Sequence, residues 1–173
     1  PVLRRSSGGG TVLQGPGCLN YSLILKIPDA APLTGITETN RFVMGRHREA
    51  LESIVHAPVE IQGHTDLTQG GLKFSGNAQR RKQRYLLFHG TFLLDMDIAF
   101  IEKILRVPAK QPAYRQNRSH TDFLTNLHVP SSTIKDALRK TWNATEELDA
   151  VPSERIEWLI QQKYATEAWT FKF

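Results

Sequence analysis

The spacing of hydrophobic residues changes about halfway along this chain. In the first half, short apolar and β-branched runs stand between glycine, proline and asparagine turn signals, which is typical of β-strands. We predict strands at residues 2–5, 20–27, 59–62, 66–68, 72–74, 78–83 and 85–94. The short strands at 66–68 and 72–74 are expected to form a hairpin around Gln69-Gly70-Gly71.

Apolar residues three and four positions apart predict the helices. The longest begins near Thr37, which can cap it, and continues to about Val55, before Pro58. Further helices are predicted at residues 97–105, 131–143 (capped by Ser131 or Ser132) and 152–164, with a loop at 108–117. Because strands fill the first half and helices dominate the second, the pattern predicts an α+β fold with a mixed, mostly antiparallel sheet and packed helices.

Composition limits the class of protein. The chain has 173 residues, 40% of them apolar and 23% charged, which fits one domain with its own core. No apolar run approaches the roughly 20 residues that a membrane-spanning helix needs. The one cysteine, Cys18, cannot form an internal disulfide, so nothing points to an oxidising compartment. We therefore expect a cytoplasmic protein that does not act at a membrane.

The charge balance predicts an acidic partner. The formal net charge is +5, and basic residues concentrate at Arg80, Arg81, Lys82 and Arg84. This cluster fits three interpretations: a solvated strand face, a nucleic-acid surface or a surface for an acidic protein. Apart from Tyr85 the run has no interleaved aromatic residues for stacking on bases, so it does not favour nucleic acid.

A glycine-rich stretch near the N-terminus is the strongest local signal. Two arginines, Arg4 and Arg5, precede Gly8-Gly9-Gly10, and successive backbone N–H groups of such a loop can bind an anion. The alternative is a flexible turn that leads into a strand. The stretch is not a Walker loop, because no Gly-Lys-Ser/Thr follows, and a strand-like run replaces the helix of a dinucleotide fingerprint.

Three motifs in one order resemble the lipoate-protein ligase family. Residues 4–12 read Arg-Arg-Ser-Ser-Gly-Gly-Gly-Thr-Val, with Asn-Tyr-Ser at 20–22. Residues 73–78 read Lys-Phe-Ser-Gly-Asn-Ala, and residues 88–94 read Phe-His-Gly-Thr-Phe-Leu-Leu. The resemblance implies a biotin/lipoate ligase fold with a core like that of class II aminoacyl-tRNA synthetases, over one catalytic domain at residues 1–173.

The resemblance also implies an activity. Such a ligase activates lipoate with ATP and Mg²⁺ to lipoyl-AMP, and then transfers the lipoyl group to a lysine of an acceptor protein. The acceptors are lipoyl domains of 2-oxoacid dehydrogenase complexes or the glycine-cleavage H protein. The family's catalytic domain has further strands and a helix ahead of the glycine loop, so we expect this chain to lack an N-terminal part. We also expect it to lack the small C-terminal accessory domain of some ligases, and members without that domain either need a partner protein for adenylation or transfer a preformed acyl group.

The family pattern assigns roles to particular positions. Lys73 would contact the lipoyl carbonyl and the adenylate phosphate, and is the expected catalytic residue. The nucleotide would contact Arg5, Gly10, Thr11, Val12, Leu13 and Lys73. Lipoate would contact Lys73, Ser7, Gly8, Gly9 and His89, and Asp66 would help to hold Mg²⁺.

Each of these positions also has a plain structural explanation. Lys73 taken alone could be an exposed strand lysine, and Val12 and Leu13 could be buried strand residues. Asp66 could form an Asx turn, and His89 could be a core histidine. Downstream, a basic cluster in a long loop is interpreted as a contact to nucleotide or acceptor; its members are Arg115, Arg118, His120 and Asp122.

Two features keep other functions open. Related octanoyltransferases carry the acyl group on a cysteine, but Cys18 lies outside the positions where those enzymes have theirs, so we interpret it as structural. Gln14 and Phe88 stand where many ligases have histidine, which leaves the substrate open between lipoate and another acyl group. An octanoyl or lipoyl transferase that needs no ATP, and a relative that only binds nucleotide or protein, therefore remain alternatives.

Overall fold

The computed structural model describes residues 1–28 and 32–172. Its strands are β1 (Cys18–Lys26), β2 (Glu60–Gln62), β3 (Asp66–Gln69), β4 (Leu72–Arg81) and β5 (Tyr85–Leu93). Its helices are α1 (Ile36–Val55), α2 (Ile98–Ile104), the 3₁₀ turn η1 (Ala113–Arg115), α3 (His120–Phe123), α4 (Ser131–Thr141), α5 (Ser153–Leu159), the π-helical η2 (Ile160–Tyr164) and α6 (Glu167–Thr170).

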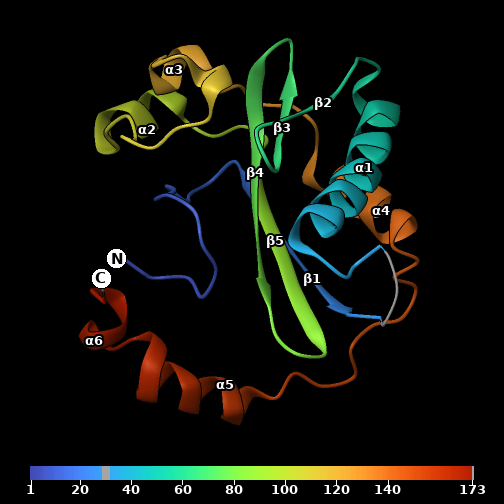
Figure 1. Ribbon diagram of the computed structural model, residues 1–173, viewed down its shortest axis with the longest axis vertical. Coiled ribbons are helices and arrows are strands. Elements are labelled where there is room, and N and C mark those ends of the chain that lie inside the picture. The colour runs from blue at the N-terminus through green and yellow to red at the C-terminus, as the bar shows by residue number, and fades with distance from the viewer. Residues whose placement is uncertain (29–31, 173) are drawn as a thin grey trace.

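The strands form one sheet in the order β1-β5-β4-β3-β2 (Figure 1). Every neighbouring pair is antiparallel. The one parallel pairing among the described residues is an isolated bridge between Lys73 and Leu124. The predicted α+β class with a mostly antiparallel sheet is therefore confirmed.

Helices α1 and α4 cover one face of this sheet, while residues 1–17, α2 and α3 lie on the other side (Figure 1). Helix α1 forms because its apolar residues return every three to four positions and bury Val43, Met44 and Leu51. In strand β5 every second side chain faces the core, which buries Leu86, Phe88 and Phe92. The core thus lies between the sheet and α1, and the opposite face of the sheet is left for a site.

Several predicted boundaries change. Residues 2–5 form no strand: the segment from Pro1 to Gly17 has no regular structure, because its polar groups bond to side chains of other elements instead of a sheet edge. The separate strands predicted at 72–74 and 78–83 are one continuous strand, β4. Thr37 does not cap α1, and neither Ser131 nor Ser132 caps α4, since Gly35 precedes α1 and Pro130 precedes α4.

The C-terminal helices differ most from the prediction. Instead of one helix at 152–164, α5 continues into the π-helical η2, and the short α3 and α6 were not predicted. No residue of α5, η2 or α6 is buried. Of the three tryptophans, Trp142 joins the core, whereas Trp158 is 49% exposed under the guanidinium of Arg155. None of the helices described is both long and apolar enough to cross a membrane.

Candidate active site

The register of the sheet decides which side chains face away from the core. On β4, Ser75, Asn77 and Gln79 lie opposite the buried Phe92, Gly90 and Phe88 of β5, so Gly76, Ala78 and Arg80 face the other way. Their partners on that side, across β5 and β1, are Thr91 with Asn20, His89 with Ser22, and Leu87 with Ile24. We call this surface the site face. Glycine, alanine and serine keep its middle shallow.

A β-bulge places the side chain of Lys73 on the site face. The register between β3 and β4 shifts at Leu67 and Thr68, so that Phe74 and Ser75 both turn toward the core. Lys73 then points along the site face, where a β-carbon on Gly76 would lie only 3.0 Å from its Nζ. Glycine at position 76 therefore leaves room for the ammonium group.

The Lys73 ammonium is paired with Asp66. Nζ lies 2.8 Å from Oδ1 of Asp66, and the two side chains are 25% and 14% exposed. Oδ2 of Asp66 accepts a hydrogen bond of 2.7 Å from the hydroxyl of Tyr114. Two predicted site residues are thus brought together, and Tyr114 is a third member that the sequence did not indicate.

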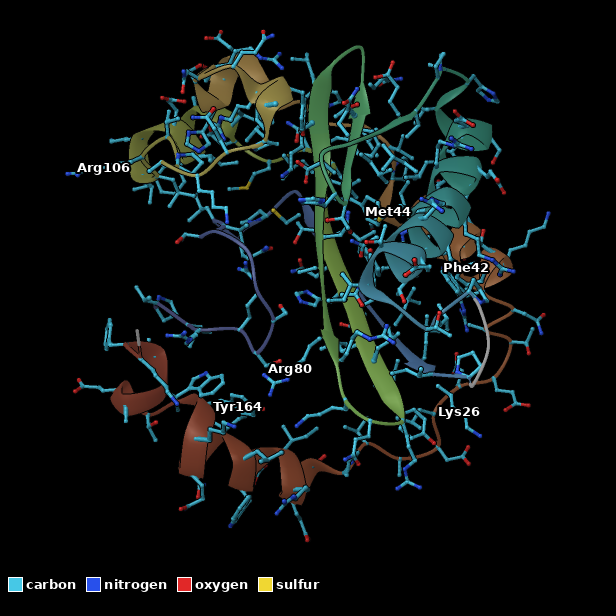
Figure 2. All side chains as sticks on the ribbon, viewed as in Figure 1. Lys26, Phe42, Met44, Arg80, Arg106 and Tyr164 are labelled. Carbon is cyan, nitrogen blue, oxygen red and sulfur yellow. The ribbon has the colours of Figure 1, made fainter. Side chains whose placement is uncertain are left out.

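The glycine segment lies over the next part of the site face. Ser7 Oγ is 2.5 Å from Nε2 of His89 on β5, and Arg80 of β4 donates to the carbonyl of Ser6. Figure 2 shows Arg80 on this side of the sheet and Met44 of α1 on the other. Ser7 and His89, both predicted to bind lipoate, are therefore in contact, and His89 is a site-face residue and not a core histidine.

Arg5 shapes the glycine loop from within. Its guanidinium donates to the carbonyls of Gly8 and Gly10, and Gly9 has a φ of +103° that favours glycine. A β-carbon on Gly9 would lie 2.6 Å from an Arg5 nitrogen, whereas Gly8 and Gly10 face open space. Burial lowers the pKa of Arg5, and burial together with the Arg5 charge lowers the pKa of His89. The imidazole at this site therefore favours its neutral form.

A closed polar triangle lies beside Gly76. Gln14 donates to Thr91, Thr91 donates to Asn20, and Asn20 donates back to Gln14, at 2.6 to 3.0 Å. These bonds fix the segment after the glycines on the sheet. Of the other predicted nucleotide contacts, Thr11 and Val12 are exposed at this surface, and Leu13 packs beside Met96 and Leu93.

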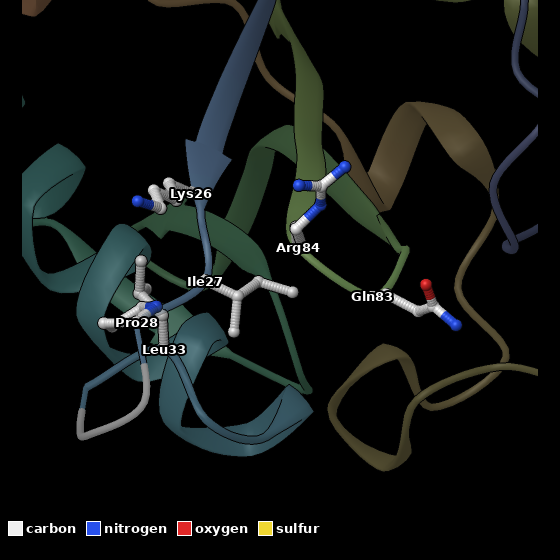
Figure 3. A pocket seen from close by; sticks show the side chains of 6 residues that line it. All are labelled: Lys26, Ile27, Pro28, Leu33, Gln83 and Arg84. Carbon is white, nitrogen blue, oxygen red and sulfur yellow. The ribbon is translucent and has the colours of Figure 1, made fainter.

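A small apolar hollow ends the site face near the β4–β5 turn. It measures about 200 Å³ and is lined by Ile24, Arg80, Lys82, Tyr85, Leu86 and Leu87. A larger hollow of about 570 Å³ lies at the far end of β1, between Lys26, Leu33 and Arg84 (Figure 3). None of the predicted site residues lines this larger hollow, so the chemistry belongs to the site face.

The loop from Arg106 to Ser119 carries the predicted basic cluster. Arg115 is 5% exposed with its guanidinium over the Phe123 ring, and Arg118 donates to carbonyls of Gly71, Tyr114 and Asp122. His120 is buried against Glu102. These contacts hold the loop on the β3–β4 turn, with Arg115 and His120 buried and Asp122 exposed. A contact of this cluster with nucleotide or acceptor stays a prediction.

Neither a metal centre nor a cysteine nucleophile is evident in this site. Over residues 1–28 and 32–172, no three histidine, cysteine, aspartate or glutamate residues gather as metal ligands, and both oxygens of Asp66 already have partners. Cys18 is half-buried and packs beside Leu93 and Met96. The assignment of Asp66 to Mg²⁺ stays a prediction.

Comparisons with known proteins agree with this arrangement. Lipoate–protein ligase 1 of Staphylococcus aureus is 30% identical over 182 residues, covering 98% of this chain and 53% of that protein. An octanoyltransferase, LipM of Symbiobacterium thermophilum, is 32% identical over 127 residues, covering 62% of this chain and 44% of that protein. A crystal structure of lipoate-protein ligase A bound with ATP matches with a TM-score of 0.81 and 22% identity, over 98% of this chain and 71% of that one.

These matches define both the family and its extent here. The chain spans about half the length of several curated relatives that match along nearly all of it. The family model described as the lipoyl protein ligase A/B catalytic domain matches residues 1–143. That range contains the whole sheet, the glycine segment and Lys73. The chain therefore belongs to the lipoyl protein ligase A/B catalytic domain family.

Proposed function

We propose that this chain is the catalytic domain of a lipoate-protein ligase that forms lipoyl-AMP from lipoate and ATP. The observation that carries the proposal is the Lys73–Asp66 pair, which holds a partly exposed ammonium beside the small residues Gly76 and Ala78 of the site face. Such an ammonium stabilises the negative charge that builds when a carboxylate attacks a phosphate. The ATP-bound relative supports the choice of nucleotide.

The proposed reaction has two steps. An oxygen of the lipoate carboxylate attacks the α-phosphorus of ATP, and the bond to pyrophosphate breaks, which gives the mixed anhydride. The neutral ε-amine of an acceptor lysine then attacks the lipoyl carbonyl carbon. An amide forms, the bond to AMP breaks, and the amine loses a proton to solvent. Lys73 acts in both steps by positioning and charge, without becoming a nucleophile.

The site face suggests how the acyl group would lie. With its carboxylate at Lys73, a medium-length acyl chain would run over Gly76, Ala78 and His89 toward the apolar hollow at Ile24 and Leu87. Two residues along a strand advance about 6.6 Å, so these rows match the length of such a chain. The glycine segment, held by Ser7 and Ser6, would cover it.

Magnesium would arrive with the nucleotide. Mg²⁺ is commonly held by substrate phosphates with only one or two protein carboxylates, and Asp66 is the carboxylate that pairs with Lys73. The residues of the site do not form a resident metal centre of their own. The acceptor would be a protein with an exposed lysine, such as a lipoyl domain. The net charge of +5 favours an acidic one.

The octanoyltransferase relative favours one alternative, transfer from an acyl carrier without ATP. Mass spectrometry of an apo lipoyl domain separates the two. One reaction contains the chain, lipoate, ATP and Mg²⁺, and the other contains the chain and octanoyl carrier protein without ATP. Modification in the first alone supports the ligase. Modification only in the reaction without ATP contradicts the ligase. Loss of the acyl transfer in Cys18→Ser would then identify a thioester route.

The first prediction concerns Lys73. Lys73→Ala removes the ammonium that pairs with Asp66, and we expect lipoyl-AMP formation, followed as pyrophosphate release, to fall by about 100-fold or more. The matched control is Lys135→Ala, an exposed lysine on α4 behind the sheet, which should keep the full rate. Circular dichroism checks that both variants fold. An unchanged rate in Lys73→Ala would remove Lys73 from the mechanism.

A further inference from the structure

Tyr114 contacts the reactive pair from an element that the family motifs do not include. It belongs to η1, in the loop that joins α2 to α3, and its hydroxyl donates to Oδ2 of Asp66 at 2.7 Å. The other oxygen of that carboxylate holds Lys73 Nζ at 2.8 Å. One carboxylate thus bridges the tyrosine and the lysine.

The Tyr114 ring lies close to two other elements. Its centroid lies 5.2 Å from that of Phe123, which is 2% exposed. The ring also lies close to the turn before β3, where a β-carbon on Gly63 would be 3.6 Å from its Cε1. Arg118 donates both to the carbonyl of Tyr114 and to that of Gly71, which ties the loop to the β3–β4 turn. The hydroxyl therefore has little freedom to leave Asp66.

The backbones of the pair are fixed independently of Tyr114. Asn77 and Thr65 exchange two hydrogen bonds just before Asp66, and the N–H of Thr125 donates to the carbonyl of Lys73. These contacts leave the rotation of the Asp66 carboxylate about its side-chain bond unfixed. The hydrogen bond from Tyr114 can fix that rotation, because hydrogen bonds to charged groups are stronger than those between neutral groups.

We propose that Tyr114 is a positioning residue, which fixes the Asp66 carboxylate so that Lys73 presents its ammonium at one place above Gly76. This inference rests on the proposed function for its kinetic consequence. The surroundings of Tyr114 agree with it: burial first, and then the Asp66 charge and hydrogen bond, raise the pKa of Tyr114, so its hydroxyl stays protonated and donates. Preorganised groups of this kind matter most in the transition state.

The kinetic test uses Tyr114→Phe, which keeps the ring against Phe123 and Gly63. We expect kcat for lipoyl-AMP formation to fall roughly tenfold, the value of one hydrogen bond to a charged group, with little change in KM for ATP or lipoate. The control is Tyr164→Phe, on η2, which should keep the full kcat. An unchanged kcat in Tyr114→Phe, or an equal loss in Tyr164→Phe, would overturn the role.

A second readout needs no activity. Acetylation of Lys73 by dilute acetic anhydride, followed by peptide mass spectrometry, should become several-fold faster in Tyr114→Phe, with Lys135 as the internal reference. The same substitution in an Asp66→Asn background should add nothing, because the effect passes through the carboxylate. An unchanged labelling rate, or an additive effect, would contradict the proposal. If the unaltered chain forms no lipoyl-AMP, the proposed function fails while this labelling test still decides the role of Tyr114.

Discussion

At the residue scale, the site depends on a one-residue irregularity in β4. In a regular strand, residues three apart such as Lys73 and Gly76 point to opposite faces. The register shift at Leu67 and Thr68 inserts one extra residue, so both face the site and the Lys73 ammonium occupies the space that Gly76 leaves. The motif Lys-Phe-Ser-Gly predicted the residues, but only the bulge explains why a lysine and a glycine three positions apart act together.

Buried His47 leads to a prediction about pH. It accepts a hydrogen bond from the indole N–H of Trp142, and burial lowers its pKa from 6.5 to about 4. Because the unfolded chain then binds a proton that the folded protein does not, the free energy of unfolding should fall as the pH drops below about 6.5, by up to about 3 kcal/mol near pH 4. Urea unfolding between pH 7 and 4.5 measures this.

The His47 prediction has a matched pair of variants. His47→Gln keeps an acceptor for Trp142 but cannot titrate, so the loss of stability with falling pH should become shallower. It should not vanish, since burial also lowers the pKa values of His89 and His120. His64→Gln changes an exposed residue and should leave the slope as it is. If His47→Gln keeps the full slope, His47 does not contribute to it.

At the element scale, β4 and β5 pack through a glycine. Gly90 lies opposite Asn77, whose side-chain Nδ2 donates to the carbonyl of Thr65 and whose Oδ1 accepts from the hydroxyl of Tyr21. A β-carbon on Gly90 would lie 1.7 Å from that Oδ1. The glycine of the Phe-His-Gly-Thr motif is therefore required by packing on the core side, while His89 beside it faces the site. Alternate residues of one strand serve stability and chemistry.

This packing predicts opposite effects for two glycine substitutions. Gly90→Ala should lower the free energy of unfolding by about 1–3 kcal/mol, because the methyl group forces Asn77 away. Gly45→Ala, in the middle of α1 with nothing within 4 Å of the added carbon, should raise it by about 0.5–1 kcal/mol through higher helix propensity. Urea unfolding of both variants measures these changes, and a change of the same sign in both variants would contradict the packing role of Gly90.

At the scale of the whole molecule, the two ends of the chain meet on the site side of the sheet (Figure 1). The indole N–H of Trp169 donates to the carbonyl of Arg4, and Lys163 lies over the Trp169 ring. The rest of the C-terminal segment, residues 144–172, contributes nothing buried in α5, η2 or α6. Its effect is therefore expected on the glycine segment and not on the core.

Removal of residues 144–173 tests whether the C-terminal segment acts on the glycine segment and not on the core. Because the core lies between the sheet and helices α1 and α4, the shortened chain should keep its melting temperature within a few degrees. Hydrogen exchange of residues 2–8 should become faster, since Arg4 loses its partner. A large fall in melting temperature, or unchanged exchange at residues 2–8, would show that the segment acts differently.

The amino-acid sequence was enough to predict the elements whose patterns are local: α1, β1, the β3–β4 hairpin and β5. It also named Lys73, Ser7 and His89, which lie at the site face, while their roles toward lipoate and nucleotide stay predictions. It could do so because helical and strand periods, turn glycines and family motifs are written in neighbouring positions. The predicted contacts of Gly10, Thr11, Val12 and Leu13 with nucleotide stay predictions.

The tertiary structure decided what no neighbouring residue encodes. It paired Lys73 with Asp66, brought Tyr114 to that pair across 48 residues of sequence, and gave the Arg115 cluster internal partners. It also made residues 2–5, a predicted strand, part of an irregular segment that Trp169 holds at Arg4 and Arg80 holds at Ser6. The physical reason is common to all four: side-chain contacts between distant segments depend on sheet register and on the path of loops, which local spacing does not fix.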